Sequence, residues 1–402
     1  MLDLFKLLGI LILIIVLLRL RWNLGLVLLL ASGLTGVLFG LSVHELIRDA
    51  LGAAVDSLTL RLVAIVLLIT YMGQILRSTL QLEGLIRAMG ELFVDRRWLL
   101  ALMPMLIGML PMVGGAMFSA PMVEEASQGL DVSRERRTFV NYWFRHSLEP
   151  VFPLYPSLVL AAGLMGATVQ ALTITQWPLF LAAVIGGILF GLLGIQRAVG
   201  AEDQSPNRKD TWVLFLKSIW PIFLVLFLSV VLGVDLILSL LLTIAALIAA
   251  HRIGPRELLA LARGTPLGTV PIIFGAMIFR RILETSHAVE AASQALAGPG
   301  IPLPIIVFAV PMVAGLLTGL AVAAFAIGFP IVFPLCGPDL VSSGYGLLAF
   351  AGGMVGMMLS PVHLCLALTR VYFKAEWGGI YRRLVPAALL LAITAFVVLW
   401  LK

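Results

Sequence analysis

The segment FVNYWFRHSLEPVFPLYPSLVLAAGL, residues 139–164, has the length of a membrane span but contains Arg145, Glu149, Pro150 and Pro153. Proline lacks a backbone donor, and its ring clashes with the preceding helical turn. In lipid, the carbonyl that loses its helical donor must find another partner. The segment therefore predicts a transmembrane helix that is broken near its middle.

The composition of the whole chain is that of an integral membrane protein. Of its 402 residues, 61% are hydrophobic and 12% charged, and the mean hydropathy is +1.09. Soluble domains have about 25% charged residues. This excludes nucleic-acid binders, secreted disulfide scaffolds and ordinary soluble enzymes. Cys336 and Cys365 lie within apolar runs, which gives no indication of a disulfide framework.

Ten segments are predicted membrane spans, because a crossing helix needs about 20 apolar residues with charges near its ends. The first is expected to be an uncleaved span rather than a signal peptide. The predicted spans are Leu2–Leu20, Leu24–Leu41, Leu58–Leu80, Phe139–Leu164, Pro178–Ile195, Trp212–Val231, Val234–Ala250, Leu267–Leu283, Tyr345–Val371 and Leu384–Leu401.

Two further apolar stretches, Trp98–Val123 and Pro302–Pro334, are interrupted by several prolines and glycines. We expect each to form a re-entrant hairpin, since the prolines leave backbone groups without helical partners. One kinked crossing for each stretch is the alternative. The residues that mark these turns are Pro111, Gly114 and Gly115 in the first stretch and Gly315 and Gly319 in the second.

The charge distribution favours the hairpins. With both stretches as hairpins, eighteen Lys and Arg residues fall on one face of the membrane and six on the other. Cytoplasmic loops carry such an excess. We therefore expect the first face to be cytoplasmic and both termini to lie outside. If either stretch crossed instead, every later loop would change sides and most of the bias would disappear.

The two halves of the chain resemble each other. The heptapeptide at 104–110, PMLIGML, matches PMVAGLL at 311–317, and LEPV at 148–151 matches LSPV at 359–362. Each half would have five crossings and one hairpin, and an odd number of crossings inverts the second half. The predicted fold is an all-α polytopic membrane protein with two inverted repeats and discontinuous helices at the midplane. The first repeat is 1–195, the cytoplasmic linker 196–211 and the second repeat 212–402.

The hairpins and the broken segments at 147–151 and 359–364 resemble the ion-transporter superfamily. Its members include sodium–dicarboxylate symporters, gluconate and citrate permeases, and sodium/proton antiporters. Within it, the sequence is most similar to an uncharacterised prokaryotic family, domain of unknown function 401. Neither predicted hairpin tip has the Ser-Asn-Thr signature of the sodium–dicarboxylate branch. The resemblance implies a homodimer in the prokaryotic inner membrane. It also implies a scaffold of early spans and a mobile unit made of hairpins and broken helices.

The first broken helix contains the chemically richest cluster. A charge at the bilayer centre costs at least about 2.5–3.5 kcal/mol on insertion scales, and such residues are usually functional. Arg145 and Glu149 are spaced i,i+4, on one helical face. We expect Arg145 to bind an anionic substrate, since its fork matches a carboxylate, and Glu149 to carry a proton or contact a cation. Alternatively the two side chains pair structurally, or Arg145 extends back to the cytoplasmic surface. Further candidates here are Asn141, His146 and Ser147.

Both breaks supply backbone groups as well. Pro150 and Pro361 leave carbonyls without helical donors, and such carbonyls hold Na⁺ or anions in transporters. The alternative is a simple kink satisfied by water. Ser360 and His363 flank the second break, and an imidazole there suits a proton relay or a packed hydrogen bond. Candidate hydroxyl donors near the hairpin tips, unless they only allow close helix packing, are Ser119 and Thr318.

No catalytic motif is present. The pair His44-Glu45 lacks a second histidine at zinc-protease spacing, and no Gly-Lys-Ser/Thr phosphate loop occurs. We expect no enzyme and no cofactor beyond Na⁺ or H⁺. The predicted function is secondary active transport of a small organic anion, most simply a carboxylate, coupled to H⁺ or Na⁺, in which an elevator-like displacement moves the substrate. The alternatives are a Na⁺/H⁺ antiporter and, from another class, an intramembrane enzyme or structural subunit. The expected partners are the lipid bilayer, the anion and a second copy of the chain, with no nucleic acid.

Overall fold

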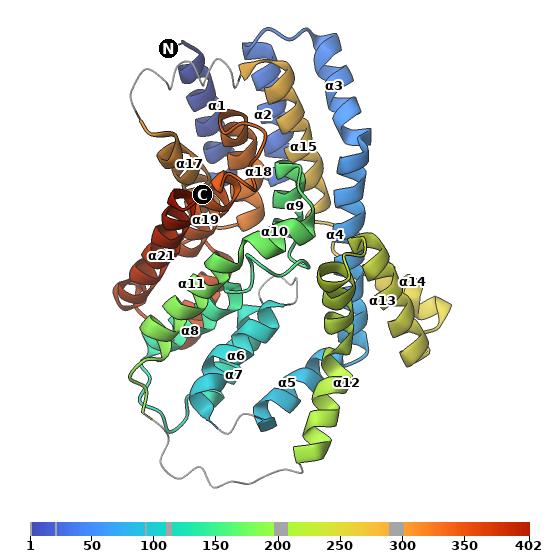
Figure 1. The fold of residues 1–402 in the computed structure, drawn as a ribbon, viewed down its shortest axis with the longest axis vertical. Coiled ribbons are helices and arrows are strands. Elements are labelled where there is room, and N and C mark those ends of the chain that lie inside the picture. The colour runs from blue at the N-terminus through green and yellow to red at the C-terminus, as the bar shows by residue number, and fades with distance from the viewer. Residues whose placement is uncertain (1, 21, 93–94, 110–114, 197–207, 289–300) are drawn as a thin grey trace.

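The structure is a computed structural model that describes residues 2–20, 22–92, 95–109, 115–196, 208–288 and 301–402 (Figure 1). These residues form helices and, within the described part, no strand, which confirms the predicted all-helical class. The helices of the first half are α1 (Leu2–Arg19), α2 (Leu24–Leu38), α3 (Val43–Val55), α4 (Ser57–Ser78), α5 (Gln81–Leu92), α6 (Arg96–Gly108), α7 (Ala116–Ala126), α8 (Arg134–His146), α9 (Pro156–Met165), α10 (Val169–Thr175), α11 (Trp177–Gly187) and the π-helical turn η1 (Ile188–Leu192).

The second half begins after the linker. Its elements are α12 (Arg208–Leu226), the π-helical turn η2 (Phe227–Val231), α13 (Leu236–His251), α14 (Pro255–Arg263), α15 (Val270–Thr285), α17 (Leu303–Thr318), α18 (Ala321–Val332), the 3₁₀ turn η3 (Phe333–Leu335), α19 (Tyr345–Leu359), α20 (Leu364–Phe373) and α21 (Trp377–Trp400).

Several helices are suited to a membrane. By length and composition, four stretches of the described chain are able to cross one: 57–78, 209–231, 345–373 and 377–400. A fifth is possible if α9 and α10, bent by 102°, count as one span. The ten predicted crossings also counted helices of 10–17 residues. A 16-residue helix is only about 24 Å long, shorter than the hydrocarbon core of about 30 Å. Ten crossings therefore stay a prediction.

Polar side chains fix where the helices begin. Asn23, Asp56, Ser133 and Asp235 cap α2, α4, α8 and α13 by accepting hydrogen bonds from backbone N–H groups of the first turn. At α3, Ser42 and Glu45 form a capping box. Each of these helix starts therefore has a local cause in the capping side chain.

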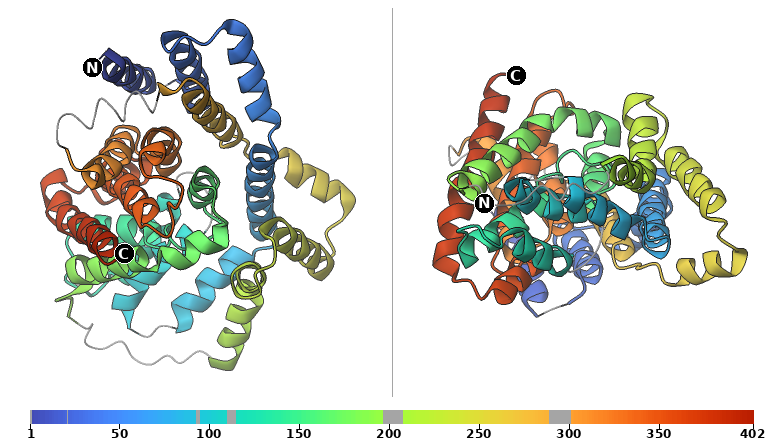
Figure 2. Two further views of the ribbon diagram at one scale, coloured as in Figure 1. Left: turned by 45° about the horizontal axis from the view of Figure 1, so that its top comes forward. Right: turned by 90° about the horizontal axis from the view of Figure 1, so that it is seen from below.

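The helices form two groups with α9 between them. Figures 1 and 2 show α4, α13 and α14 on one side of the molecule and α17–α21 on the other. Helix α9 packs against α4 on one side and α18 on the other. The largest fully buried side chains include Phe139, Tyr142, Trp143 and Phe144, all on α8. The core of the protein is therefore built around α8.

Two helix pairs occupy the stretches in which hairpins were predicted. Helix α6 packs against α7, and α17 packs against α18 (Figure 1). The turn between α17 and α18 is made by Gly319, whose φ of +67° is a left-handed conformation that favours glycine. A Cβ built at Gly328 would lie 2.8 Å from Cα of Pro311, so the arms of this pair are in close contact.

Helix α17 also lies very close to α19. A Cβ on Gly352 would collide with the carbonyl of Phe308, and one on Gly356 with the carbonyl of Met312. A Cβ on Gly315 would lie 2.6 Å from the carbonyl oxygen of Gly353. Small residues allow two helix backbones to approach in this way. The second helix pair is therefore fixed against α19 by backbone contact.

We predict that Gly356→Ala destabilises the protein by about 1–3 kcal/mol, the usual consequence of overpacking, since the methyl group meets a backbone carbonyl of α17. The matched control is Gly52→Ala on α3, where a Cβ has no neighbour within 4 Å. The control is expected to be neutral or slightly stabilising. Thermal unfolding of both purified variants in detergent measures this, and an unchanged melting temperature in Gly356→Ala would contradict the close packing.

Candidate functional site

Helix α8 ends in a buried break. Its last residue is His146, and the chain is not α-helical again until Pro156. Arg145, His146 and Glu149 have exposed fractions of 5%, 8% and 5%. The indole of Trp143 donates a hydrogen bond to the carbonyl of Ala183, 2.7 Å away. This bond ties α8 to α11, and so the charged groups are held deep in the protein.

One tyrosine closes the first break. The hydroxyl oxygen of Tyr155 lies 2.6 Å from the carbonyl oxygen of Gly108 and 3.1 Å from that of Arg145. A Cβ on Gly108 would collide with the Arg145 carbonyl, so α6 touches α8 at this point. The single hydroxyl proton is shared between, or donated to one of, two carbonyls at the ends of two helices, and buried polar groups require such a partner.

Hydroxyl groups also serve the second break, where α19 ends at Leu359 and α20 begins at Leu364. The hydroxyl oxygen of Tyr142, on α8, lies 3.3 Å from the carbonyl oxygen of Met357 and 3.2 Å from that of Met358. The hydroxyl of Tyr381 donates to the carbonyl of Leu359 at 2.7 Å. The α19 end is therefore hydrogen-bonded to α8 of the first half, and the two breaks lie side by side.

Each helix pair ends against one of the breaks. A Cβ on Gly319 would lie 2.7 Å from the backbone nitrogen of His363. The hydroxyl of Ser360 donates to the carbonyl of Leu316 at 2.6 Å, close to the same turn. In the first half, a Cβ on Gly115 would lie 2.6 Å from Cζ of Arg145. A larger side chain at position 319 would displace the backbone of His363, and one at position 115 would displace the guanidinium of Arg145.

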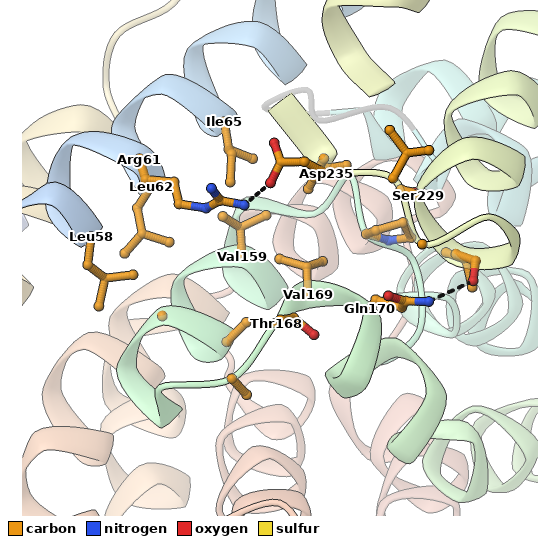
Figure 3. Close-up of a pocket in the computed structure, with 18 residues that line it drawn as sticks. Leu58, Arg61, Leu62, Ile65, Val159, Thr168, Val169, Gln170, Ser229 and Asp235 are labelled. Atoms are coloured by element: carbon orange, nitrogen blue, oxygen red, sulfur yellow. Dashed lines mark hydrogen bonds and ion pairs between the residues drawn. The ribbon is translucent and has the colours of Figure 1, made fainter. Parts of the chain in front are cut away.

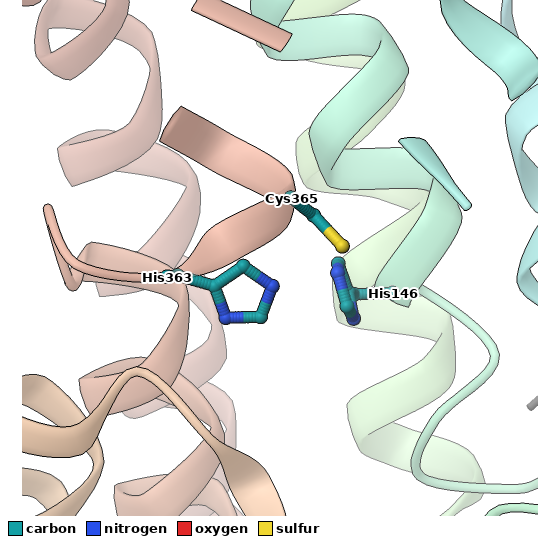
Figure 4. A group of neighbouring side chains, drawn as sticks. All are labelled: His146, His363 and Cys365. Carbon is teal, nitrogen blue, oxygen red and sulfur yellow. The ribbon is translucent and has the colours of Figure 1, made fainter. Parts of the chain in front are cut away.

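Titratable side chains from both halves meet between the breaks. Nδ1 of His146 lies 3.2 Å from a carboxylate oxygen of Glu149, and the Ser157 hydroxyl donates to the other oxygen at 2.8 Å. The rings of His146 and His363 are 4.8 Å apart between centroids and meet edge to face. The thiol of Cys365 lies beside both rings (Figure 4).

The other predicted site residues make more local contacts. The amide nitrogen of Asn141 donates to the carbonyl of Ala116 at 3.1 Å and to the hydroxyl of Thr369 at 3.0 Å, so it joins α7, α8 and α20. The hydroxyls of Ser147, Ser119 and Thr318 donate to carbonyls of their own helices. The predicted positions Pro111 and Gly114 lie outside the described residues.

Three members of the site were not found from the sequence: Tyr142, Ser157 and Cys365. The spacing His363-x-Cys365 was the available signal for the cysteine, since two donors of this kind are typical of metal sites. No sequence signal distinguishes Tyr142 from a packing residue, because its partner lies 216 residues away in the chain. Ser157 is only eight residues from its partner Glu149, but the irregular backbone between them gives no spacing that predicts the contact.

A cavity of about 350 Å³ lies next to this region and is lined by residues of α4, α9, α10 and the start of α13 (Figure 3). Its wall includes Leu62 of α4, Val159 of α9, and Gln170 of α10. Arg61 of α4 forms an ion pair with Asp235 across its rim. The cavity lies between α4 and α13 on one side and α9 and α10 on the other. Helices α4 and α9 still touch, since a Cβ on Gly163 would lie 2.5 Å from the Leu62 side chain.

The comparison with known families gives one match. The sequence matches the family described as "Protein of unknown function (DUF401)" over residues 2–401. The chain belongs to this family. Among proteins with curated descriptions, none matches it. The match covers both breaks and the titratable cluster between them.

We predict that Tyr155→Phe lowers the free energy of unfolding by about 1–3 kcal/mol, because buried carbonyls lose their hydroxyl partner. The matched control is Tyr372→Phe, whose hydroxyl donates to Glu124 in an exposed position. Exposed substitutions of this kind usually change stability by less than about 0.5 kcal/mol. Thermal unfolding measures both, and equal melting temperatures would contradict the role of Tyr155 in closing the break.

Proposed function

We propose that this protein is a secondary active transporter of a small organic anion, most simply a carboxylate, coupled to H⁺ or Na⁺. The observation that carries the proposal is the meeting of two broken helices, each with the turn of a helix pair against it. Discontinuous helices around a central site are typical of secondary transporters. The chain would lie in the prokaryotic inner membrane with both termini outside.

The contacts of the two halves support an inverted repeat. Gly108 of α6 lies against the carbonyl of Arg145, and Gly315 of α17 lies against Gly353 and Gly356 of α19. Gly108 and Gly315 are equivalent in the two matched heptapeptides of the sequence. A helix pair therefore touches the broken helix of its own half in the same manner in each repeat.

Arg145 is the proposed anion ligand. Its side chain is 5% exposed and its guanidinium lies against Gly115, the residue before α7. A planar guanidinium binds a carboxylate through two parallel hydrogen bonds. The Glu149 carboxylate contacts His146 and Ser157, which places it within reach of protons arriving at His146. Carbonyls near Pro150 and Pro361 are the proposed Na⁺ ligands.

The two breaks differ in exposure, and this supports alternating access. The residues of the first break are mostly buried, whereas Pro361, Val362 and Leu364 at the second are exposed. In the proposed elevator movement, α6–α9 and α17–α20 carry the site past a scaffold that includes α4 and α13. The cavity of Figure 3 lies along this boundary. In a homodimer, the scaffolds of the two copies would contact each other and stay fixed while the mobile units move.

We predict that Arg145→Ala reduces the uptake of labelled carboxylates into proteoliposomes at least about 100-fold, since a buried charge-assisted bond contributes about 2–3 kcal/mol or more. The control is Arg87→Ala on α5, whose side chain is 76% exposed. Uptake by the control is expected to equal that of the unchanged protein. Undiminished uptake in Arg145→Ala would remove this residue from the site.

A Na⁺/H⁺ antiporter on the same scaffold is the second candidate. The buried contact between His146 and Glu149 favours it, because both groups exchange protons. It predicts Na⁺-driven proton flux in a pH-jump fluorescence assay without any organic anion, lost in Glu149→Gln. Flux that appears only when a carboxylate is present would exclude the antiporter and favour the symporter.

A further inference from the structure

Three side chains that bind transition metals converge between the breaks. His146 ends α8, His363 precedes α20, and Cys365 lies in the first turn of α20. One ligand atom from each lies within 4.8 Å of the others. Figure 4 shows the Cys365 sulfur directed toward the His146 ring, with the His363 ring opposite. All three are buried, with exposed fractions of 8%, 4% and 8%.

The imidazoles have nitrogen atoms that no hydrogen bond satisfies in the described part of the chain. These are Nε2 of His146 and both ring nitrogens of His363, each in a buried position. A buried polar atom without a partner is costly and calls for a specific explanation. The rings are held in place, since the Tyr142 ring packs against His146 at 5.3 Å and against His363 at 5.1 Å. One nitrogen of each ring and the Cys365 thiol therefore face one small volume.

We propose that His146, His363 and Cys365 bind a divalent metal ion of the zinc class, with a fourth coordination position left open. Two imidazoles and one thiolate suit Zn²⁺, whereas Mg²⁺ and Ca²⁺ need oxygen ligands. Zn–N and Zn–S lengths of about 2.1 and 2.3 Å imply ligand atoms about 3.5 Å apart in a tetrahedron. The observed spacing reaches this value when each side chain moves by less than about 1 Å.

The surroundings of His146 support this assignment. Its Nδ1 contacts the Glu149 carboxylate, which itself accepts a hydrogen bond from Ser157. Histidine ligands of metals almost always donate their second nitrogen to such a carboxylate, which fixes the tautomer. With Nδ1 protonated, Nε2 has a free lone pair aimed at the cluster. Binding releases the thiol proton of Cys365 to solvent. The thiolate and the Glu149 carboxylate then balance the two positive charges of the ion.

This site goes beyond the proposed transport function and does not depend on it. The ion would join α8 of the first half to α20 of the second, because its ligands come from both. Three protein ligands leave a position that an anion or water is able to fill, as in zinc sites that keep an open position. A bound metal ion and a proton relay through His146 or His363 exclude each other, since the ion occupies the ring nitrogen that the relay needs.

The experiment uses purified full-length protein in detergent, stripped with a chelator and then titrated with Co²⁺ and Zn²⁺. It starts from the Cys336→Ser variant, in which Cys365 is the one remaining thiol of the chain. We expect one ion per chain and a thiolate-to-cobalt charge-transfer absorption that Zn²⁺ abolishes by displacement. Because no transport is measured, this result is independent of the proposed function.

Matched variants complete the test. Cys365→Ser is expected to remove the charge-transfer band and to lower Zn²⁺ affinity more than about 100-fold, and Glu149→Gln to lower it about 10–100-fold. Size-exclusion profiles check that both variants are folded. If Cys336→Ser binds no Co²⁺ or gives a spectrum without the thiolate band, the site does not exist. Equal Zn²⁺ affinity in Cys365→Ser would likewise overturn the proposal and leave the proton relay as the role of His363.

Discussion

The structure depends on satisfying main-chain carbonyls where two buried helices stop. Where a helix stops inside the protein, away from bulk water, another group of the protein has to replace the lost helical bond. Here the donors are tyrosine hydroxyls: Tyr155 serves the first break, and Tyr142 and Tyr381 serve the second. Because Tyr142 belongs to α8 and its acceptors to α19, the same bonds that satisfy one break also hold the two breaks together.

Close backbone contact positions the rest of the site. Gly108, Gly315 and Gly356 let helices of the paired stretches approach the broken helices without a Cβ between them. The turn at Gly319 then lies against the backbone of His363. Packing of this kind is sensitive to single methyl groups. The polar groups at the centre are therefore placed by rigid neighbours, and a movement of one pair would carry its half of the site with it.

Much of the fold follows from the sequence because its signals are local. Composition and proline spacing predicted an all-helical protein with apolar helices, which is confirmed, and the family match is confirmed over nearly the whole chain. The ten predicted crossings stay a prediction, since several of these apolar segments form helices too short for the length criterion. Cys365 was missed although its spacing from His363 is local, because the third member of the cluster, His146, is far away in the chain. The site roles of Arg145 and Glu149 stay predictions.

The central claim is that the breaks lie at an aqueous pathway rather than in lipid. It is tested most directly by thiol labelling in proteoliposomes, with single cysteines introduced into a variant that lacks both native ones. Val362 is 46% exposed at the second break, whereas Val355, two turns earlier on α19, is 4% exposed. A membrane-impermeant maleimide is expected to label Val362→Cys and to leave Val355→Cys unlabelled. Absence of labelling at Val362→Cys from both sides of the membrane would contradict it.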